Sequence, residues 1–280
     1  MTPGRRRFAI LLLAVLLVIH LCAFGLYWAR DRQSRLLGLY LDARDQWREG
    51  HLDTAAAEYT AFLAERPSAA WPVVLFRNFP SAASGWFVLG RVEAERGRVD
   101  AALTAFSRAM QLEPGRGRRE YRDLLLLSGR PAALAAFARL ELARDPSSVP
   151  AARDLGAALL ALGQPAEAAQ AYEQALARLP ALLARIDPAS PGGLSSEEAD
   201  LRSLLSVAAR RAGDRTRADA LCAEIGRRQA TAARLNRLCL AFARADAGDV
   251  PGSRAALAGY LPPAPEHEAL VRELLARLGG

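Results

Sequence analysis

The sequence predicts an all-α protein in which one apolar N-terminal helix precedes a series of stacked helical hairpins. Hydrophobic residues make up 51% of the 280 residues, and most of them are Ala and Leu, which favour helices over sheets. A long apolar run follows the first few residues, and one pattern of small and large residues recurs in distant segments. Together these observations predict an anchored helical repeat protein.

The N-terminal segment has the composition of a membrane span. Residues 1–7 carry three arginines, and residues 8–28 read FAILLLAVLLVIHLCAFGLYW, with His20 as the only ionisable side chain. As a helix this run is about 30 Å long, the thickness of a bilayer's hydrocarbon core. We predict a single transmembrane helix at 8–28 and a juxtamembrane linker at 29–35.

Two alternatives for this segment stay open. A cleaved signal peptide would use residues 8–19 as its apolar region and 23–25 as its cleavage site, although Phe and Leu surround that site. Arginines flank the run on both sides, so the rule that relates positive charge to orientation is nearly balanced. We expect the later domain outside the cytoplasm, because a charged N-terminus before a long apolar run is typical of export signals. His20 is either a tolerated neutral residue or a contact to another helix or cofactor.

Two segments carry the recurring pattern most clearly. Residues 83–114 contain Trp86, Leu89, Gly90, Gly97, Ala102, Phe106, Ala109 and Pro114. Residues 149–180 repeat the register with Leu155, Gly156, Gly163, Ala168, Tyr172, Ala175 and Pro180. This pattern closely resembles the tetratricopeptide repeat (TPR), in which each unit is a hairpin of two helices. The resemblance implies an all-α solenoid.

Each position in this pattern has a mechanical role. Gly90 and Ala102 let the two helices cross closely, Phe106 fills the space between hairpins, and Gly97 permits the tight turn. Proline at 114 ends the second helix. Weaker copies begin near residues 36, 115, 199 and 232, so we predict about six repeats over 36–263. An amphipathic C-terminal helix at 264–280 then caps the array.

Two stretches depart from the repeat. An insertion at 70–82 contains Trp71, Phe76 and Phe79, which either pack on neighbouring hairpins or form a partner-binding loop. A flexible linker is predicted at 186–198. Within it Ser195 and Glu198 have the spacing of a capping box for the next helix.

Catalytic and metal motifs are not found in the sequence. There is no lysine, so a P-loop or Schiff base is excluded, and neither GxSxG nor HExxH occurs. The net charge of +7 comes from arginine alone and reflects either genome composition or an acidic partner. Cys22, Cys222 and Cys239 lack metal-site spacing; the last two fall at apolar helix positions, and a bridge between them stays open. We predict no enzyme activity, cofactor, nucleic-acid partner or small-molecule substrate.

The resemblance also implies a binding surface. In TPR proteins, peptides lie in the concave groove formed by the first helices of the hairpins. The matching positions here are Tyr40, Arg44, Trp47, Phe87, Arg91, Arg116, Arg119 and Arg153. A groove of this composition suits an acidic protein segment, because guanidinium groups bind carboxylates through paired hydrogen bonds.

The resulting functional hypothesis is a membrane-anchored scaffold or assembly factor of a bacterial envelope complex. The expected location is the inner membrane, as a single-pass protein with a periplasmic solenoid. The alternative is an accessory structural subunit that contacts an integral-membrane complex mainly through its transmembrane helix. An enzyme with an unrecognised site is a distant third.

Overall fold

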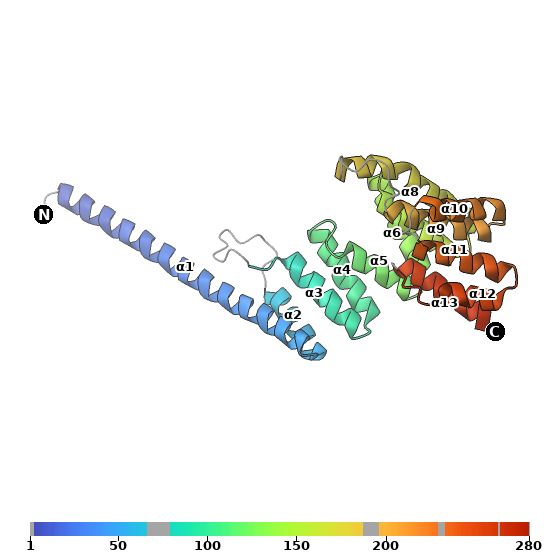
Figure 1. The fold of residues 1–280 in the computed structure, drawn as a ribbon. Helices are drawn as coiled ribbons and strands as arrows, with labels where there is room; N and C mark the ends of the chain where they lie inside the picture. The colour runs from blue at the N-terminus through green and yellow to red at the C-terminus, as the bar shows by residue number, and fades with distance from the viewer. Residues whose placement is uncertain (1–2, 66–78, 187–195, 229–232, 263, 280) are drawn as a thin grey trace. The chain divides into compact units, whose positions relative to one another are not determined.

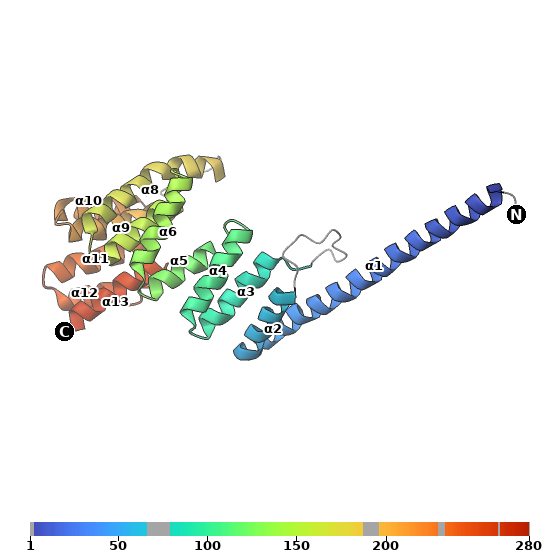
Figure 2. The same cartoon turned by 180° about the vertical axis from the view of Figure 1, so that it is seen from behind.

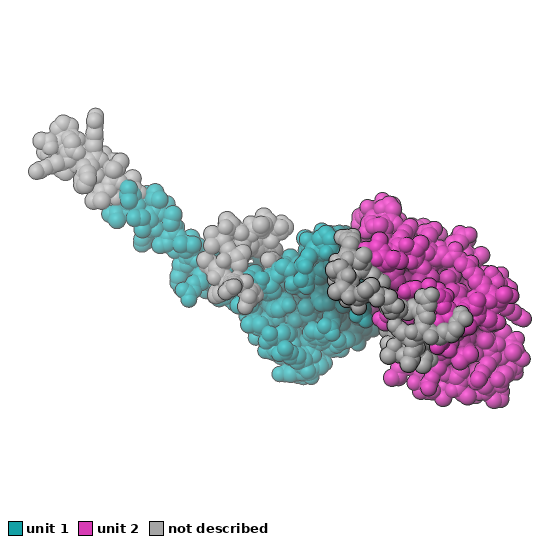
Figure 3. Space-filling view, turned by 45° about the horizontal axis from the view of Figure 1, so that its top comes forward, with its two compact units in different colours: residues 1–121 teal, residues 122–280 magenta. Residues whose placement is uncertain are grey.

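The computed structural model contains thirteen α-helices and no strand among the residues it describes (Figure 1). Those residues are 3–65, 79–186, 196–228, 233–262 and 264–279; for 3–14, 183–186, 227, 228 and 233–235 the backbone alone is described. The chain forms two compact units, residues 1–121 and 122–280 (Figure 3). The boundary between the units lies inside the third of the repeats predicted over 36–263.

Unit 1 holds two close-packed hairpins. The first pairs the C-terminal half of α1 (Pro3–Arg48) with α2 (Leu52–Glu65), and the second pairs α3 (Ala82–Glu95) with α4 (Val99–Leu112). A buried cluster of Ala43, Tyr59, Leu89, Val92 and Ala105 joins them. Both hairpins were predicted, and the array is confirmed here.

Unit 2 holds the remaining hairpins and the terminal helix. Its elements are α6 (Pro131–Arg144), α7 (Val149–Ala161), α8 (Pro165–Ile186), α9 (Ser196–Arg211), α10 (Arg215–Arg228), α11 (Ala233–Asp246), α12 (Val250–Leu257) and α13 (Pro265–Gly279). One large core runs through α7–α13 and includes Tyr172, Leu204 and Leu274. The C-terminal helix predicted from its amphipathic pattern is confirmed.

The boundary between the units falls within α5 (Arg118–Leu127). Only Leu125 of this helix is fully buried, and α5 makes few backbone contacts with α6. The sequence predicts only a weaker copy of the repeat from residue 115 onward. Helices α5 and α6 do not pack closely on each other as the other pairs do, and α6 packs against α7 instead.

The repeat glycines have the roles expected of them. A Cβ on Gly90 would lie 2.6 Å from Cε1 of Phe106, and one on Gly156 would lie 2.7 Å from Cε1 of Tyr172. The helices of each hairpin therefore cross too closely for any larger residue. At the α3–α4 turn, Gly97 has a φ of 74°, a conformation that favours glycine.

Three boundaries differ from the predictions. Residues 29–35, expected as a linker, lie inside the continuous helix α1. Pro180, which stands at the position where Pro114 ends α4, lies inside α8. Helix α8 continues because Leu179 and Leu182 pack against the core of unit 2, which offsets the lost backbone hydrogen bond. The linker predicted at 186–198 lies mostly outside the described residues, as does Ser195, and α9 already begins at Ser196.

The apolar part of α1 is exposed from the point where its side chains are described. Ten large side chains between Val15 and Trp28 have 49% to 73% of their surface exposed. His20 and Cys22 lie on the same exposed stretch. Within the described part of the chain, no helix is both long enough and apolar enough to cross a membrane. The predicted span starts at Phe8, and residues 8–14 lie outside the described side chains.

Candidate functional site

The first helices of the two hairpins in unit 1 form a groove that we call the unit 1 groove. Three of the predicted residues, Tyr40, Arg44 and Trp47, line its pocket, and Arg91 and Arg116 lie over the rings of Trp47 and Phe87. Its centre is a pocket of about 400 Å³ between α1, α2 and α3. The pocket is lined by Tyr40, Arg44, Trp47, Arg48, Tyr59 and Val88. The structure therefore brings Tyr40, Arg44 and Trp47 together around one pocket, and binding of a client there stays a prediction.

The floor of the pocket is aromatic and fixed. The ring of Tyr40 meets those of Tyr59 and Phe62 edge to face, with centroids 5.4 Å apart in both cases. Tyr59 and Phe62 are fully buried. Burial raises the pKa of Tyr40, although the charges of Arg44 and Arg116 oppose the rise. The floor therefore offers an uncharged aromatic surface to an apolar side chain.

Guanidinium groups lie over aromatic rings along the groove. The Cζ of Arg91 is 4.7 Å from the centre of the Trp47 ring, and Trp47 Nε1 donates a 2.7 Å hydrogen bond to Glu95 Oε2. The Cζ of Arg116 is 6.0 Å from the centre of the Phe87 ring. Stacking of this kind orients an arginine while leaving donors at its edge for a ligand.

Local carboxylates accompany some of these arginines. Arg116 donates to both oxygens of Glu113, at 2.6 and 3.0 Å, and Arg44 Nε donates to Asp45 at 3.2 Å. The hydrogen bond from Arg116 lowers the pKa of Glu113. Glu113 and Asp45 are exposed, so these pairs contribute little to stability and leave the arginines able to exchange partners.

The remaining predicted residues lie elsewhere. Arg119 is exposed on α5, at the C-terminal end of unit 1. Phe79 contacts Phe62 with ring centroids 6.5 Å apart, so this residue of the insertion packs on the first hairpin. Trp71 and Phe76 lie outside the described residues.

The structure corrects the predicted position of Arg153. It was predicted to line an open groove, but in unit 2 only 9% of its surface is exposed. Its Nε donates to Glu266 Oε1 at 2.6 Å, and its Nη2 contacts a carboxylate oxygen of Asp200. Arg153 thus already holds two carboxylates, one of them from a helix 113 residues further along the chain.

Two more residues complete this buried cluster in unit 2. His267 is fully buried, with Nε2 2.8 Å from Asp200 Oδ1, and Arg122 Nη2 is 3.9 Å from Glu266 Oε2. Burial would raise the pKa of Glu266, but the charges of Arg153 and Arg122 outweigh it and the pKa is lowered. Burial would also raise the pKa of Asp200, but its contacts with His267 and Arg153 have the larger effect and lower that pKa.

Sequence reasoning missed four members of this cluster: Arg122, Asp200, Glu266 and His267. They come from α5, α9 and α13, and no spacing rule links residues so far apart. Among the described residues, Asp200, Glu266 and His267 are the one group whose ligand-type atoms could converge on a metal ion. Arg153 donates to both carboxylates, so its guanidinium supplies the positive charge that a cation would bring.

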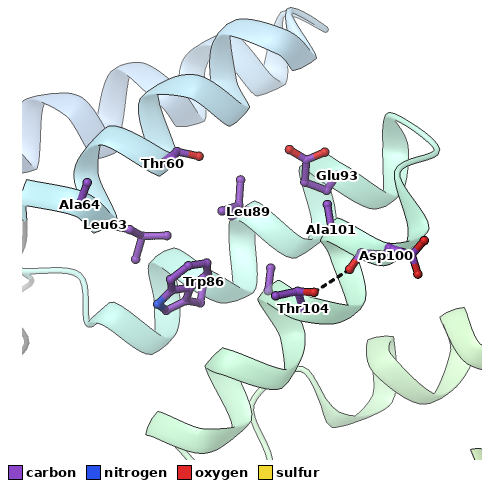
Figure 4. Close-up of a pocket in the computed structure, with 10 residues that line it drawn as sticks. Thr60, Leu63, Ala64, Trp86, Leu89, Glu93, Asp100, Ala101 and Thr104 are labelled. Atoms are coloured by element: carbon purple, nitrogen blue, oxygen red, sulfur yellow. Dashed lines mark hydrogen bonds between the residues drawn. The ribbon is translucent and has the colours of Figure 1, made fainter. Parts of the chain in front are cut away.

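A second hollow in unit 1 was also not predicted. Figure 4 shows it between α2, α3 and α4, with a volume of about 560 Å³ and Leu63, Trp86 and Leu89 on its walls. At one end Thr104 donates a 2.8 Å hydrogen bond to the backbone oxygen of Asp100. The hollow is largely apolar and could receive an apolar side chain.

The cysteines carry no site. Cys222 and Cys239 are buried free thiols in a small cluster with Ala199 and Ile225, which confirms them as core residues. The Ser206 hydroxyl lies 3.0 Å from Cys239 Sγ.

Stacked helical hairpins with a lined inner groove define the class of helical repeat proteins that bind other proteins. The sequence model of the tetratricopeptide repeat matches residues 40–116 and 122–191, and the chain belongs to this family. No curated protein sequence matches the chain.

Several solved structures are similar in fold. The TPR-like repeats of a putative kinesin light chain from Podosopora anserina share 20% identity, with 72% of this chain and 98% of that one covered and a TM-score of 0.48. MamA from Desulfovibrio magneticus RS-1 shares 16% identity over 69% and 93% of the two chains, with a TM-score of 0.46. YrrB, described as a TPR protein with an unusual peptide-binding site, shares 16% identity over 66% and 82%, with a TM-score of 0.42.

Proposed function

We propose that this chain is a scaffold, held at a membrane by its N-terminal helix, that binds a protein client in the unit 1 groove. The observation that carries the proposal is the pocket between Tyr40, Arg44 and Trp47, with Arg91 stacked on the Trp47 ring. Concave, largely apolar pockets with a few oriented polar groups are the usual form of a binding site. Membership of the TPR family supports a protein as the ligand.

The client's binding segment is acidic and carries an apolar anchor. A pocket of about 400 Å³ with an aromatic floor accepts one large apolar side chain. Arg44, Arg91 and Arg116 surround it with donors in the planar arrangement that binds carboxylates in pairs. Because the carboxylates now beside Arg44 and Arg116 are exposed, a client carboxylate can replace them at little cost.

Membrane attachment is supported by the exposed apolar stretch of α1. The large apolar side chains between Val15 and Trp28 are 49% to 73% exposed, with Arg32 over the Trp28 ring, and arginines flank the apolar run on both sides. An uncovered apolar surface of this length is expected to enter a bilayer or another protein. We place the chain in the bacterial inner membrane, with the repeats on the periplasmic side, where it recruits its client to an envelope complex.

The test uses a labelled peptide of glutamates around one tryptophan, with a lysine-for-glutamate peptide as its reference. Arg44→Glu with Arg91→Glu is expected to weaken binding of the acidic peptide by about tenfold or more, because like charges then face each other. Arg108→Glu on α4 is the matched control, since Arg108 is exposed on a second helix. Equal binding of both peptides, or unchanged binding by the double variant, would refute the groove.

The second candidate is an accessory subunit whose N-terminal helix is its main contact. The exposed face of α1, which includes His20 and Cys22, favours it, because such a face can pack against another membrane helix. Deleting residues 1–30 separates the two functions. Client binding that survives the deletion supports the groove, and binding that is lost while the remaining helices stay folded supports the accessory subunit.

A further inference from the structure

Charged side chains from α7, α9 and α13 occupy the inner face of unit 2. Arg153 on α7 stands at the repeat position that Phe87 occupies on α3, so its side chain points to the same inner face. Asp200 lies one helical turn before the corresponding position on α9, on the same face. The residues that reach this face from the far end of the chain are Glu266 and His267, in the first turn of α13.

The contacts at this face come from successive first helices. Glu266 meets Arg122 of α5 and Arg153 of α7, while His267 meets Asp200 of α9. In both views of the fold the start of α13 lies beside the C-terminal end of α5 (Figures 1 and 2). Only 5% of the Glu266 surface is exposed. A carboxylate is thus bound by arginines of the first helices, as a client carboxylate would be.

The rest of α13 resembles a bound amphipathic helix. Leu270 and Leu274 are buried against the core of unit 2, while Glu268 and Arg272 form an exposed pair at 2.8 Å. Among the described residues between α12 and α13, Ala258, Gly259 and Leu261 are exposed, Leu261 over 78% of its surface, while Tyr260 is buried.

We propose that the inner face of unit 2 is a second binding site for an acidic amphipathic helix, and that α13 occupies it as the chain's own ligand. The partner is a protein segment that presents a glutamate in its first turn followed by leucines at helical spacing. This segment displaces α13 and takes its contacts with Arg122 and Arg153. The site is independent of the unit 1 groove.

The experiment uses the full chain with Arg44→Glu and Arg91→Glu, so that the unit 1 groove does not contribute. The probe is a labelled peptide of residues 264–280, added in trans. Adding Glu266→Gln to the chain weakens its own α13 and is expected to tighten probe binding about tenfold, within the usual range of coupling between competing ligands. Glu268→Gln is the matched control and should leave binding as it was.

Two further variants identify the contact. A probe peptide that itself carries Glu266→Gln should not bind the Glu266→Gln chain more tightly. A chain that combines Glu266→Gln with Arg153→Gln should likewise show no increase in affinity for the probe. A Glu266→Gln chain with unchanged circular dichroism and no gain in probe binding overturns the proposal, because α13 is then a fixed part of the fold.

Hydrogen exchange on the unmodified chain tests the proposal without any variant. If α13 is displaceable, its amides exchange through local opening, faster than those of α7 and α9. Protection of residues 265–279 equal to that of α9 would show that α13 leaves only when unit 2 unfolds, and the proposal would fail.

Discussion

The inner faces of the two units are built on one repeat pattern but end in different states. In unit 1 the arginines lie over the Trp47 and Phe87 rings and a pocket remains between the helices. In unit 2, Arg153 is buried among carboxylates from α9 and α13. The difference is that in unit 2 a carboxylate from the C-terminal helix, Glu266, already binds the arginine of the inner face.

The largest difference between the units is expected on removing the buried arginine. Arg153→Ala leaves Glu266 and Asp200 buried without their main partner, which costs about 3–5 kcal/mol in comparable cases. Urea unfolding should show this loss, whereas Arg91→Ala in unit 1 should have a much smaller effect. A loss below about 1 kcal/mol for Arg153→Ala would mean that water or local movement replaces the guanidinium.

The close helix crossing should be equally sensitive in both units. Gly90→Ala and Gly156→Ala place a methyl group against Phe106 and Tyr172, and we expect a loss of about 1–3 kcal/mol for each. Gly38→Ala is the control, because nothing lies within 4 Å of a Cβ there. Thermal unfolding should show no loss for the control, and tolerance of Ala at one crossing alone would contradict the shared geometry.

Acid should remove the contribution of the buried cluster of unit 2 to the free energy of unfolding, and added salt should not change this loss. The folded-state pKa values of Glu266 and Asp200 are lowered, so their contribution is complete above the unfolded-chain pKa of about 4. It is lost as the pH falls through the lowered folded-state values. Glu113 in unit 1 also has a lowered pKa, but its side chain is exposed, so salt should screen its pair with Arg116. The free energy of unfolding of the Glu266→Gln variant should fall less steeply at acid pH than that of the unmodified chain. An unchanged slope would contradict the assignment of this pH dependence to Glu266.

The smallest effect is expected at the stacked arginine of unit 1. Arg91→Ala removes a cation–π contact with Trp47, which is worth about 0.5–1 kcal/mol at an exposed site. Arg91→Lys keeps the charge but loses the planar stacking, so it should restore stability in part and peptide binding less well. Urea unfolding followed by circular dichroism measures the first effect, and peptide titration measures the second.

Much of the fold follows from local pattern. The positions of Gly90, Gly97 and Phe106 mark a hairpin because each constraint acts within about thirty residues, and three of the eight predicted groove residues line the pocket of unit 1. Prediction failed where longer contacts compete. Pro180 does not end α8 because Leu179 and Leu182 are held by the core, and residues 29–35 stay helical with α1.

The amino-acid sequence by itself determined the helical hairpins, their order and the arginine-rich inner faces, since these depend on periodicity and on small residues at close crossings. Tertiary structure alone decided the division at residue 121 and the burial of Arg153. Glu266 and His267 meet Arg153 and Asp200 only after the hairpins have stacked, because burial and electrostatic attraction act between residues that are close in space and no local pattern records that proximity.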